Sequence, residues 1–224
     1  MVHDPNSTVT IHEALERFLL QLGADGRSEH TVAQYRRHVR LFACWLEKEQ
    51  GGTHLGVLNP EVVARFMVSP EARNRADGTP KKPTAVNALR SSIRCFSAYL
   101  HDAGLVAANP GRLLRRAICS SRRSRALDET EVQRFVAALE GKDDPPGQRD
   151  RALFTLMLAT GIRIGSALGL DVQDVDLVRG ELLLRQTKGS RVDRVFLPQT
   201  VLPAVAALVA EVGAGPVFRN GGGR

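Results

Sequence analysis

The segment Val86-Asn-Ala-Leu-Arg-Ser-Ser-Ile-Arg-Cys-Phe-Ser-Ala-Tyr-Leu100 carries large apolar side chains at steps of three, four, three and four residues. An α-helix completes one turn about every 3.6 residues, so this spacing gathers the apolar side chains on one face. The same steps recur in residues 32–46, with Val32, Tyr35, Val39, Phe42 and Leu46. Two long amphipathic helices therefore decide the fold class of the first half of the chain.

Shorter helices are predicted on either side of the segment 32–46. Residues 9–22 show a helical apolar pattern, and residues 59–68 begin with Asn59-Pro60-Glu61, a cap followed by proline at the first helical position. Ser28 is the expected N-cap of the first long helix. Together the four helices predict a small all-α domain over residues 8–110.

The charge of the chain favours a nucleic-acid partner. The 224 residues carry 31 basic and 24 acidic side chains, a net charge of +7, and 26 of the bases are arginine. A planar guanidinium binds phosphate through two hydrogen bonds, so a nucleic acid is the leading candidate for a partner. Five arginines lie off the apolar faces of the two long helices, where they either face DNA or are simply solvated: Arg36, Arg37, Arg40, Arg90 and Arg94.

Residues 111–127 are predicted to form an arginine-rich linker between two domains. Six arginines fall within fourteen positions that contain no acid: Arg112, Arg115, Arg116, Arg122, Arg123 and Arg125. Such a run is either a solvated, flexible linker or a segment that lies along the phosphate backbone of a nucleic acid. Both interpretations stay open from the sequence alone.

The second half, residues 128–224, has the pattern of a mixed α and β domain. A helix opens at Asp128-Glu-Thr-Glu131, and residues 148–160 are apolar on most sides, which predicts a buried central helix after a loop at 143–147. A helix from about 162 to 170 follows. Strands are predicted at 181–186 and 191–197, joined by a hairpin turn, and a last helix at 199–212.

Two residues of this half are candidates for chemistry. Arg163 follows Ala159-Thr-Gly-Ile162 and begins the next predicted helix, where a cation opposes the helix dipole unless an anion is bound there. Lys188 lies at the tip of the predicted hairpin, where a lysine can donate a proton or contact phosphate. The plain alternative for both is a solvated surface cation.

Other classes of protein are disfavoured. The N-terminus lacks the pattern of a signal peptide, and no apolar stretch approaches the roughly 20 residues that span a bilayer. Cys44, Cys95 and Cys119 are widely spaced and form no C-x-x-C pair. We therefore expect a cytoplasmic protein without a metal site or cofactor and without membrane contact.

The order of these features resembles the tyrosine recombinase (phage integrase) family, including the Xer-type enzymes. The resemblance covers nearly the whole chain and is carried by residues 84–110, 127–131, 159–163 and 170–198. It implies a mainly α protein with a four-helix, SAM-like core-binding domain, followed by the first part of an α+β catalytic domain with a small antiparallel sheet. Arg163 matches the first catalytic arginine of that family, and Lys188 matches its catalytic lysine.

The resemblance also implies an activity. In that family a tyrosine attacks a DNA phosphodiester, which forms a 3′-phosphotyrosyl link and frees a 5′-hydroxyl. Two arginines and histidine-class residues stabilise the transition state, and the lysine protonates the leaving hydroxyl. Neither metal nor cofactor is needed, and the enzymes assemble as tetramers on DNA.

The chain departs from the family pattern in several positions. The H-x-x-R box is absent because all six histidines precede the predicted linker, and the only tyrosines, Tyr35 and Tyr99, are predicted to be core residues. Ser166 stands where the family usually has an acid that orients the arginine. No nucleophile is identified, and about a third of a family-length catalytic domain is expected to be missing.

The sequence therefore predicts a truncated tyrosine recombinase that binds DNA, does not cleave it alone and does not form the family's tetramer in isolation. Three alternatives remain open. Another chain supplies the missing half and restores activity, the chain is a DNA-occupying competitor of a full-length relative, or it is a gene remnant or cloned fragment. The DNA target and the direction of recombination do not follow from the sequence.

Overall fold

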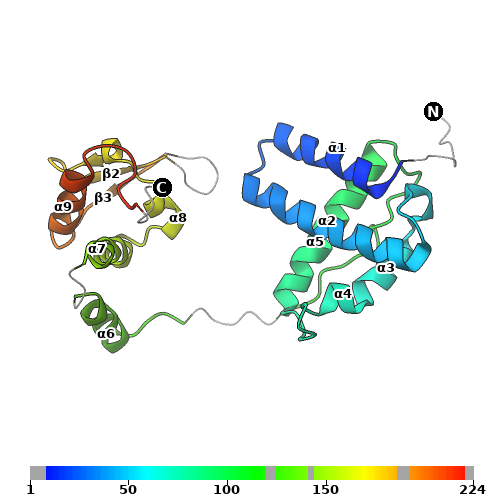
Figure 1. Cartoon of the computed structure of the whole chain (residues 1–224), viewed down its shortest axis with the longest axis horizontal. Helices are drawn as coiled ribbons and strands as arrows, with labels where there is room; N and C mark the ends of the chain where they lie inside the picture. The colour runs from blue at the N-terminus through cyan, green and yellow to red at the C-terminus, as the bar shows by residue number, and fades with distance from the viewer. Residues whose placement is uncertain (1–8, 120–124, 141–143, 186–191, 220–224) are drawn as a thin grey trace. The chain divides into compact units, whose positions relative to one another are not determined.

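The computed structural model describes residues 9–119, 125–140, 144–185 and 192–219, which fall into two compact units, residues 1–122 and 123–224. Figure 1 shows the helices of each unit and the small sheet of the second. The predicted fold class, mainly α with a small antiparallel sheet, is confirmed. No helix in the described ranges is long and apolar enough to cross a membrane.

The first unit consists of three longer helices and several short ones. Its elements are α1 (Ile11–Ala24), α2 (Glu29–Gln50), η1 (Leu55–Val57), α3 (Pro60–Val68), α4 (Pro70–Arg73) and α5 (Pro83–Asp102). The predicted caps are confirmed, because Ser28 accepts from the amide of Thr31 and Asn59 accepts from the amides that follow it. The four-residue α4, capped by Ser69, was not predicted because it is too short to show a period.

The core of the first unit is built from the apolar faces that the sequence predicts. Phe18, Phe42, Phe66 and Phe96 are almost fully buried at its centre. Tyr35 and Tyr99 are half-buried and pack their rings 5.4 and 5.2 Å from the ring of Phe18. Burial, followed by a hydrogen bond with Cys95, raises the pKa of Tyr35 to about 12. Both tyrosines are therefore core-packing residues, as predicted.

A histidine joins the two long helices of this core. His38 of α2 lies with Nδ1 2.7 Å from Oγ of Ser92 on α5, and the Ser92 hydroxyl in turn donates to the carbonyl of Ala88. Burial lowers the pKa of His38 to about 4, and the nearby charges of Arg37 and Lys81 add to this effect. The folded unit therefore holds His38 neutral.

We expect the first unit to lose stability as the pH falls from about 6.5 to about 4. In this window the unfolded histidine, with its ordinary pKa of 6.5, binds a proton that the folded one, with a pKa of about 4, does not bind. Because His38 is only half-buried, solvent screening reduces the loss to about 1–2 kcal/mol. Urea unfolding at pH 7 and pH 4.5 measures it, and His38→Asn should lose less. An equal loss in both proteins would contradict the assignment.

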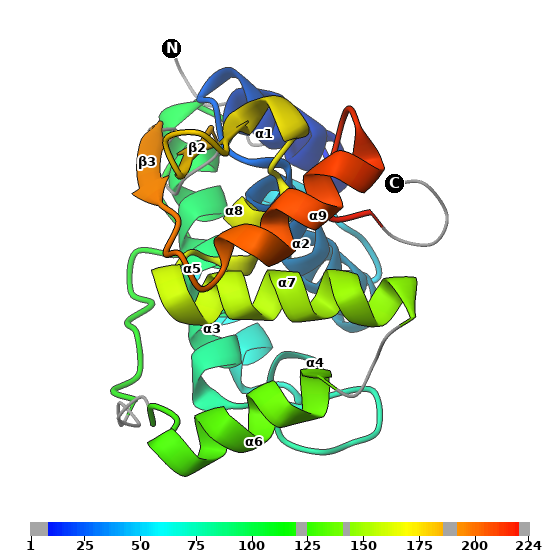
Figure 2. The same cartoon turned by 90° about the vertical axis from the view of Figure 1, so that its left-hand side faces the viewer.

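The second unit combines four helices with a three-stranded sheet. Its elements are α6 (Glu129–Glu140), α7 (Pro145–Thr160), α8 (Ile164–Leu168), η2 (Val172–Asp174), β1 (Val175–Asp176), β2 (Glu181–Leu184), β3 (Asp193–Phe196) and α9 (Leu202–Val212). The strands are antiparallel in the order β1-β2-β3, with Leu182 of β2 paired to Val175 and to Val195. Figure 2 shows α9 lying alongside α7, which it contacts.

Several predicted boundaries in this unit are wrong. The helix predicted at 148–160 begins at Pro145, because Asp144 accepts from the amide of Gly147 and the prolines fit the first turn, where no amide is needed. The helix predicted at 162–170 is only Ile164–Leu168. The predicted hairpin turn, 187–190, lies outside the described residues.

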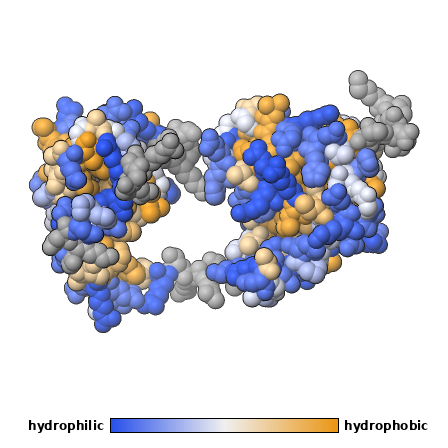
Figure 3. Space-filling view, in the orientation of Figure 1, coloured by the Kyte–Doolittle hydropathy of each residue, from blue (hydrophilic) through white to orange (hydrophobic). Residues whose placement is uncertain are grey.

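The prediction that α7 is buried on most sides is also wrong in part. Ala152, Leu153 and Leu156 are buried in the core of the second unit, but Leu158 is 41% exposed. On the short α8, Ile164 and Leu168 are 50% and 48% exposed. Figure 3 shows hydrophobic and hydrophilic side chains mixed over the visible surface of each unit. One face of this helix pair is therefore open to solvent in the described structure.

Candidate nucleic-acid interface

Arg163 lies in a tightly held turn between α7 and α8. Gly161 ends α7 with a φ of 69°, a left-handed conformation that suits glycine, and its amide bonds to the carbonyl of Met157. Ile162, next to it, is buried in the core of the second unit. The turn therefore fixes the backbone on one side of Arg163, while its side chain is exposed.

The electrostatic argument for an anion beside Arg163 becomes weaker in the structure. Arg163 occupies the N-cap position of α8, but α8 has only five residues, so its dipole is small. Among the described residues the Arg163 guanidinium forms no salt bridge. Its assignment as the catalytic arginine remains a prediction that rests on the motif.

Lys188, the second predicted catalytic residue, lies outside the described residues, but the base of its hairpin is described. Arg185 follows β2 directly and forms an ion pair with Asp174, whose side chain is only 1% exposed. Asp174 also accepts from the amide of Asp171, so one buried carboxylate ties the end of β2 to η2. No local pattern predicts this pair, because two strands and a turn separate the partners along the chain.

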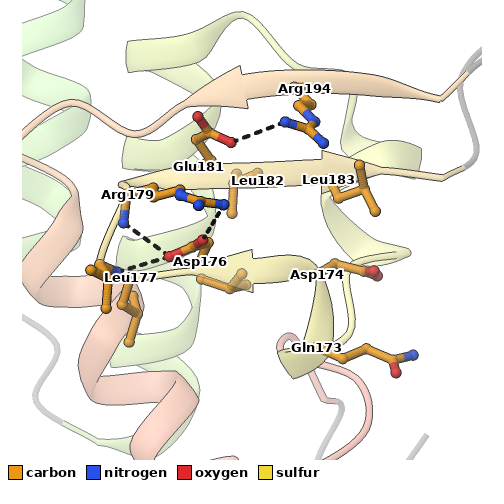
Figure 4. A pocket seen from close by; sticks show the side chains of 11 residues that line it. Gln173, Asp174, Asp176, Leu177, Arg179, Glu181, Leu182, Leu183 and Arg194 are labelled. Carbon is orange, nitrogen blue, oxygen red and sulfur yellow. Dashed lines mark hydrogen bonds and ion pairs between the residues drawn. The ribbon is translucent and has the colours of Figure 1, made fainter.

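The outer face of the sheet holds a shallow pocket that contains neither predicted catalytic residue. Figure 4 shows two pairs among its charged side chains. Arg194 of β3 lies 3.7 Å from Glu181 of β2, and Arg179, in the turn after β1, lies 3.9 Å from Asp176. These two arginines and two carboxylates neutralise one another. No three His, Cys, Asp or Glu side chains of the described chain come together as a metal site would require. The charged side chains that line this pocket are therefore engaged with one another.

The predicted DNA-binding arginines of the first unit differ in their surroundings. On α2, Arg37 and Arg40 are exposed and Arg36 is half-buried, with Arg40 4.0 Å from Glu16 of α1. On α5, Arg94 is exposed, whereas half-buried Arg90 donates from Nη1 to Oδ1 of Asn87. Arg37, Arg40 and Arg94 are therefore the helix arginines with most freedom to meet a phosphate.

The predicted linker arginines divide between the two units. The chain after α5 packs back on the first unit up to Cys119, so Arg112, Arg115 and Arg116 are exposed on that unit. Arg125 instead forms an ion pair of 2.5 Å with Glu131 of α6. Arg122 and Arg123 lie outside the described residues. The predicted contacts of these six arginines with DNA remain untested.

Two family models match the chain. Residues 15–104 match the phage integrase N-terminal SAM-like domain, and residues 125–216 match the phage integrase family. Tyrosine recombinase XerD of Mycobacterium tuberculosis is 31% identical over 190 residues, covering 83% of this chain and 59% of the relative. XerD of Ralstonia nicotianae is 30% identical over 188 residues, covering 84% and 56%. The chain thus spans less than two thirds of the length of these relatives.

Solved structures show the same fold. A lambda integrase tetramer bound to a Holliday junction superposes with a TM-score of 0.70 at 18% identity, covering 98% of this chain and 62% of that one. The Tn1549 transposon integrase in complex with transposon right end DNA gives 0.67 at 15% identity, covering 96% and 72%. At such low identity the likeness concerns the arrangement of helices and strands.

Proposed function

Because the chain belongs to the phage integrase family of tyrosine recombinases, we propose that its 224 residues form a unit that binds double-stranded DNA for site-specific recombination and do not cut DNA alone. The observation that carries this proposal is a basic surface on the first unit. Residues 78–119 hold seven lysines and arginines and a single acid, Asp102. Of these bases, Arg94, Arg112, Arg115 and Arg116 are exposed on α5 and on the segment that follows it.

A surface of this kind binds DNA mainly through phosphates. Each guanidinium that neutralises a phosphate releases counterions, so affinity falls with salt and depends little on base sequence. Exposed arginines on the helices α2 and α5 can also reach base edges, which would add sequence preference. The lambda integrase structure contains DNA bound by a tetramer, and we propose a duplex or a branched DNA as the partner here as well.

The catalytic part of the proposal assigns Arg163 and Lys188 to the reacting phosphate. The arginine stabilises the charge of the transition state, and the lysine protonates the departing 5′-oxygen, which leaves as a 5′-hydroxyl. A covalent step also needs a tyrosine whose oxygen can reach phosphorus, and both tyrosines of these 224 residues pack on the core of the first unit. The 224 residues therefore bind DNA without forming the phosphotyrosyl link, which also makes a DNA-occupying competitor of a longer relative possible.

A second candidate function is activity by complementation, in which another polypeptide supplies the tyrosine and the H-x-x-R box. The exposed apolar side chains of Leu158, Ile164 and Leu168 favour it, because a catalytic domain needs such surface to hold further elements. Binding of the 224 residues to DNA is common to both candidates.

Fluorescence anisotropy with a labelled duplex of about three helical turns tests the proposed function. We expect binding that weakens as salt rises from about 50 to 200 mM and that persists on unrelated sequences with lower affinity. The Arg65→Ala variant is the matched control, because Arg65 on α3 is paired with Glu61 at 2.7 Å and should contribute little. No binding at the lowest salt would overturn the proposal.

A further inference from the structure

We propose that Asn87 is a positioning residue that clamps the arginine-bearing segment 111–119 against α5 and so presents its arginines to DNA in a fixed arrangement. This inference rests on the proposed function, because it concerns the same basic surface. Asn87 lies near the start of α5, and its side chain is 4% exposed. A buried amide needs hydrogen-bond partners, and Asn87 finds them on a segment thirty residues later in the chain.

The clamp is a pair of hydrogen bonds to one residue. Nδ2 of Asn87 donates to the carbonyl of Ala117 at 2.8 Å, and Oδ1 accepts from the amide of Ala117 at 3.0 Å. The amide side chain thus supplies the donor and acceptor that a neighbouring β-strand would supply. Nδ2 also lies 3.0 Å from Sγ of Cys119. Both backbone groups of Ala117 are satisfied by a single side chain.

A second anchor lies at the other end of the segment. Gly111 is buried, and a Cβ at this position would lie 2.8 Å from Cβ and Oγ of Ser97 on α5. Its amide donates to Oδ1 of Asn109 at 2.9 Å. Between the anchors, Leu114 packs against the core of the first unit. The segment therefore lies against α5 at both ends and against the core of the first unit in the middle.

The arginines lie between these anchors. Arg112, Arg115 and Arg116 are exposed, so the attachments hold the backbone and leave the guanidinium groups free. Asn87 also accepts from Nη1 of Arg90, which joins a helix arginine to the same clamp. A flexible segment loses conformational entropy when it becomes ordered on DNA. A segment that is already ordered in the free protein avoids this loss on binding.

This role predicts a signature that differs from losing a phosphate contact. When an arginine is removed, fewer counterions are released and the salt dependence of affinity flattens. When the segment is only unclamped, the arginines can still reach phosphates in the complex. Affinity should then fall while the slope of log affinity against log salt stays the same.

The test uses the full chain with Asn87→Leu, which keeps the number and branching of the side-chain heavy atoms and removes both hydrogen bonds. We expect amide exchange at Ala117 to rise at least roughly tenfold and DNA affinity to fall about three- to tenfold at an unchanged salt slope. Asn87→Asp retains the acceptor for the Ala117 amide and loses only the donor to its carbonyl, so exchange there should rise less than in Asn87→Leu. Ser92→Ala, another buried polar residue of α5 that does not touch the segment, is the control for general destabilisation.

Gly111→Ala provides an independent route should Asn87→Leu not fold. Its Cβ collides with Ser97 and displaces the anchor at Gly111 without touching Asn87, so the same loss of affinity at an unchanged slope is expected. Unchanged exchange at Ala117 in Asn87→Leu, or a flattened slope, would overturn the proposal. Amide exchange at Ala117 is measured without DNA. If the wild-type chain does not bind DNA, the proposed function is refuted, and the exchange rate still decides whether Asn87 clamps the segment.

Discussion

A polypeptide of these 224 residues, incubated with a nicked suicide substrate carrying the core site of a relative, should give no covalent protein–DNA band on a denaturing gel. A phosphotyrosyl link needs a tyrosine that can approach a phosphate. Tyr35 and Tyr99 instead pack on Phe18, and burial raises the pKa of Tyr35 to about 12. We expect no covalent product at all, because no other group of the chain resembles the nucleophile of the family.

The controls separate the ways in which this expectation can fail. A band that survives in Tyr35→Phe/Tyr99→Phe would reveal a nucleophile other than tyrosine. A band that disappears in that double variant would show that one of these tyrosines leaves the core, against its packing here. If a polypeptide carrying the remaining catalytic residues of a relative is added, a band that appears only in the mixture supports complementation.

The helical first unit could be predicted from sequence because its signals are local. Apolar steps of three and four residues define the long helices, and Ser28 and Asn59 cap helices within three residues of themselves. Each signal is satisfied inside one turn or one helix face, so it does not depend on the rest of the fold. The short α4 shows the limit, because four residues are too few for a period to emerge.

The second unit was harder to predict because its elements are short and depend on partners far along the chain. The pair Pro145-Pro146 has the composition of a loop, yet both residues fit the first turn of α7 once Asp144 caps it. The two-residue β1 exists because β2 pairs with it, which no local pattern of Val175 and Asp176 reveals.

The candidate site shows the same division between local and distant signals. The turn before Arg163 could be predicted from its glycine, but the ion pair of Arg185 with Asp174 and the hydrogen bonds of Asn87 to Ala117 join residues whose proximity is set by the fold. The predicted linker also proved to be attached to the first unit up to Cys119, because a buried amide holds it there. From a run of arginines without acids, a segment that packs on a domain cannot be told from a flexible linker.

Replacing Arg112, Arg115 and Arg116 together with alanine should weaken binding to all DNA sequences and flatten its salt dependence. Each phosphate contact contributes about 0.9 to the slope of log affinity against log salt, so three lost contacts should reduce it by about 2.7. These three arginines are exposed on an anchored segment, whereas Arg125 is already paired with Glu131. Because the replaced side chains lie at the surface, the stability of the first unit should hardly change. Anisotropy titrations at four or more salt concentrations measure the slope.

Two comparisons make the result specific to these arginines. Arg65→Ala removes one exposed arginine that is paired with Glu61, so its slope should match the wild-type slope. Arg94→Ala, on the exposed side of α5, should also change the preference between related sites if α5 lies in a groove and reads bases, since phosphate contacts alone carry no sequence information. An unchanged slope in the triple variant would mean that the segment is an anchored but solvated part of the first unit. DNA binding would then have to reside on other exposed bases, among which the arginines of α2 and α5 are the next to replace.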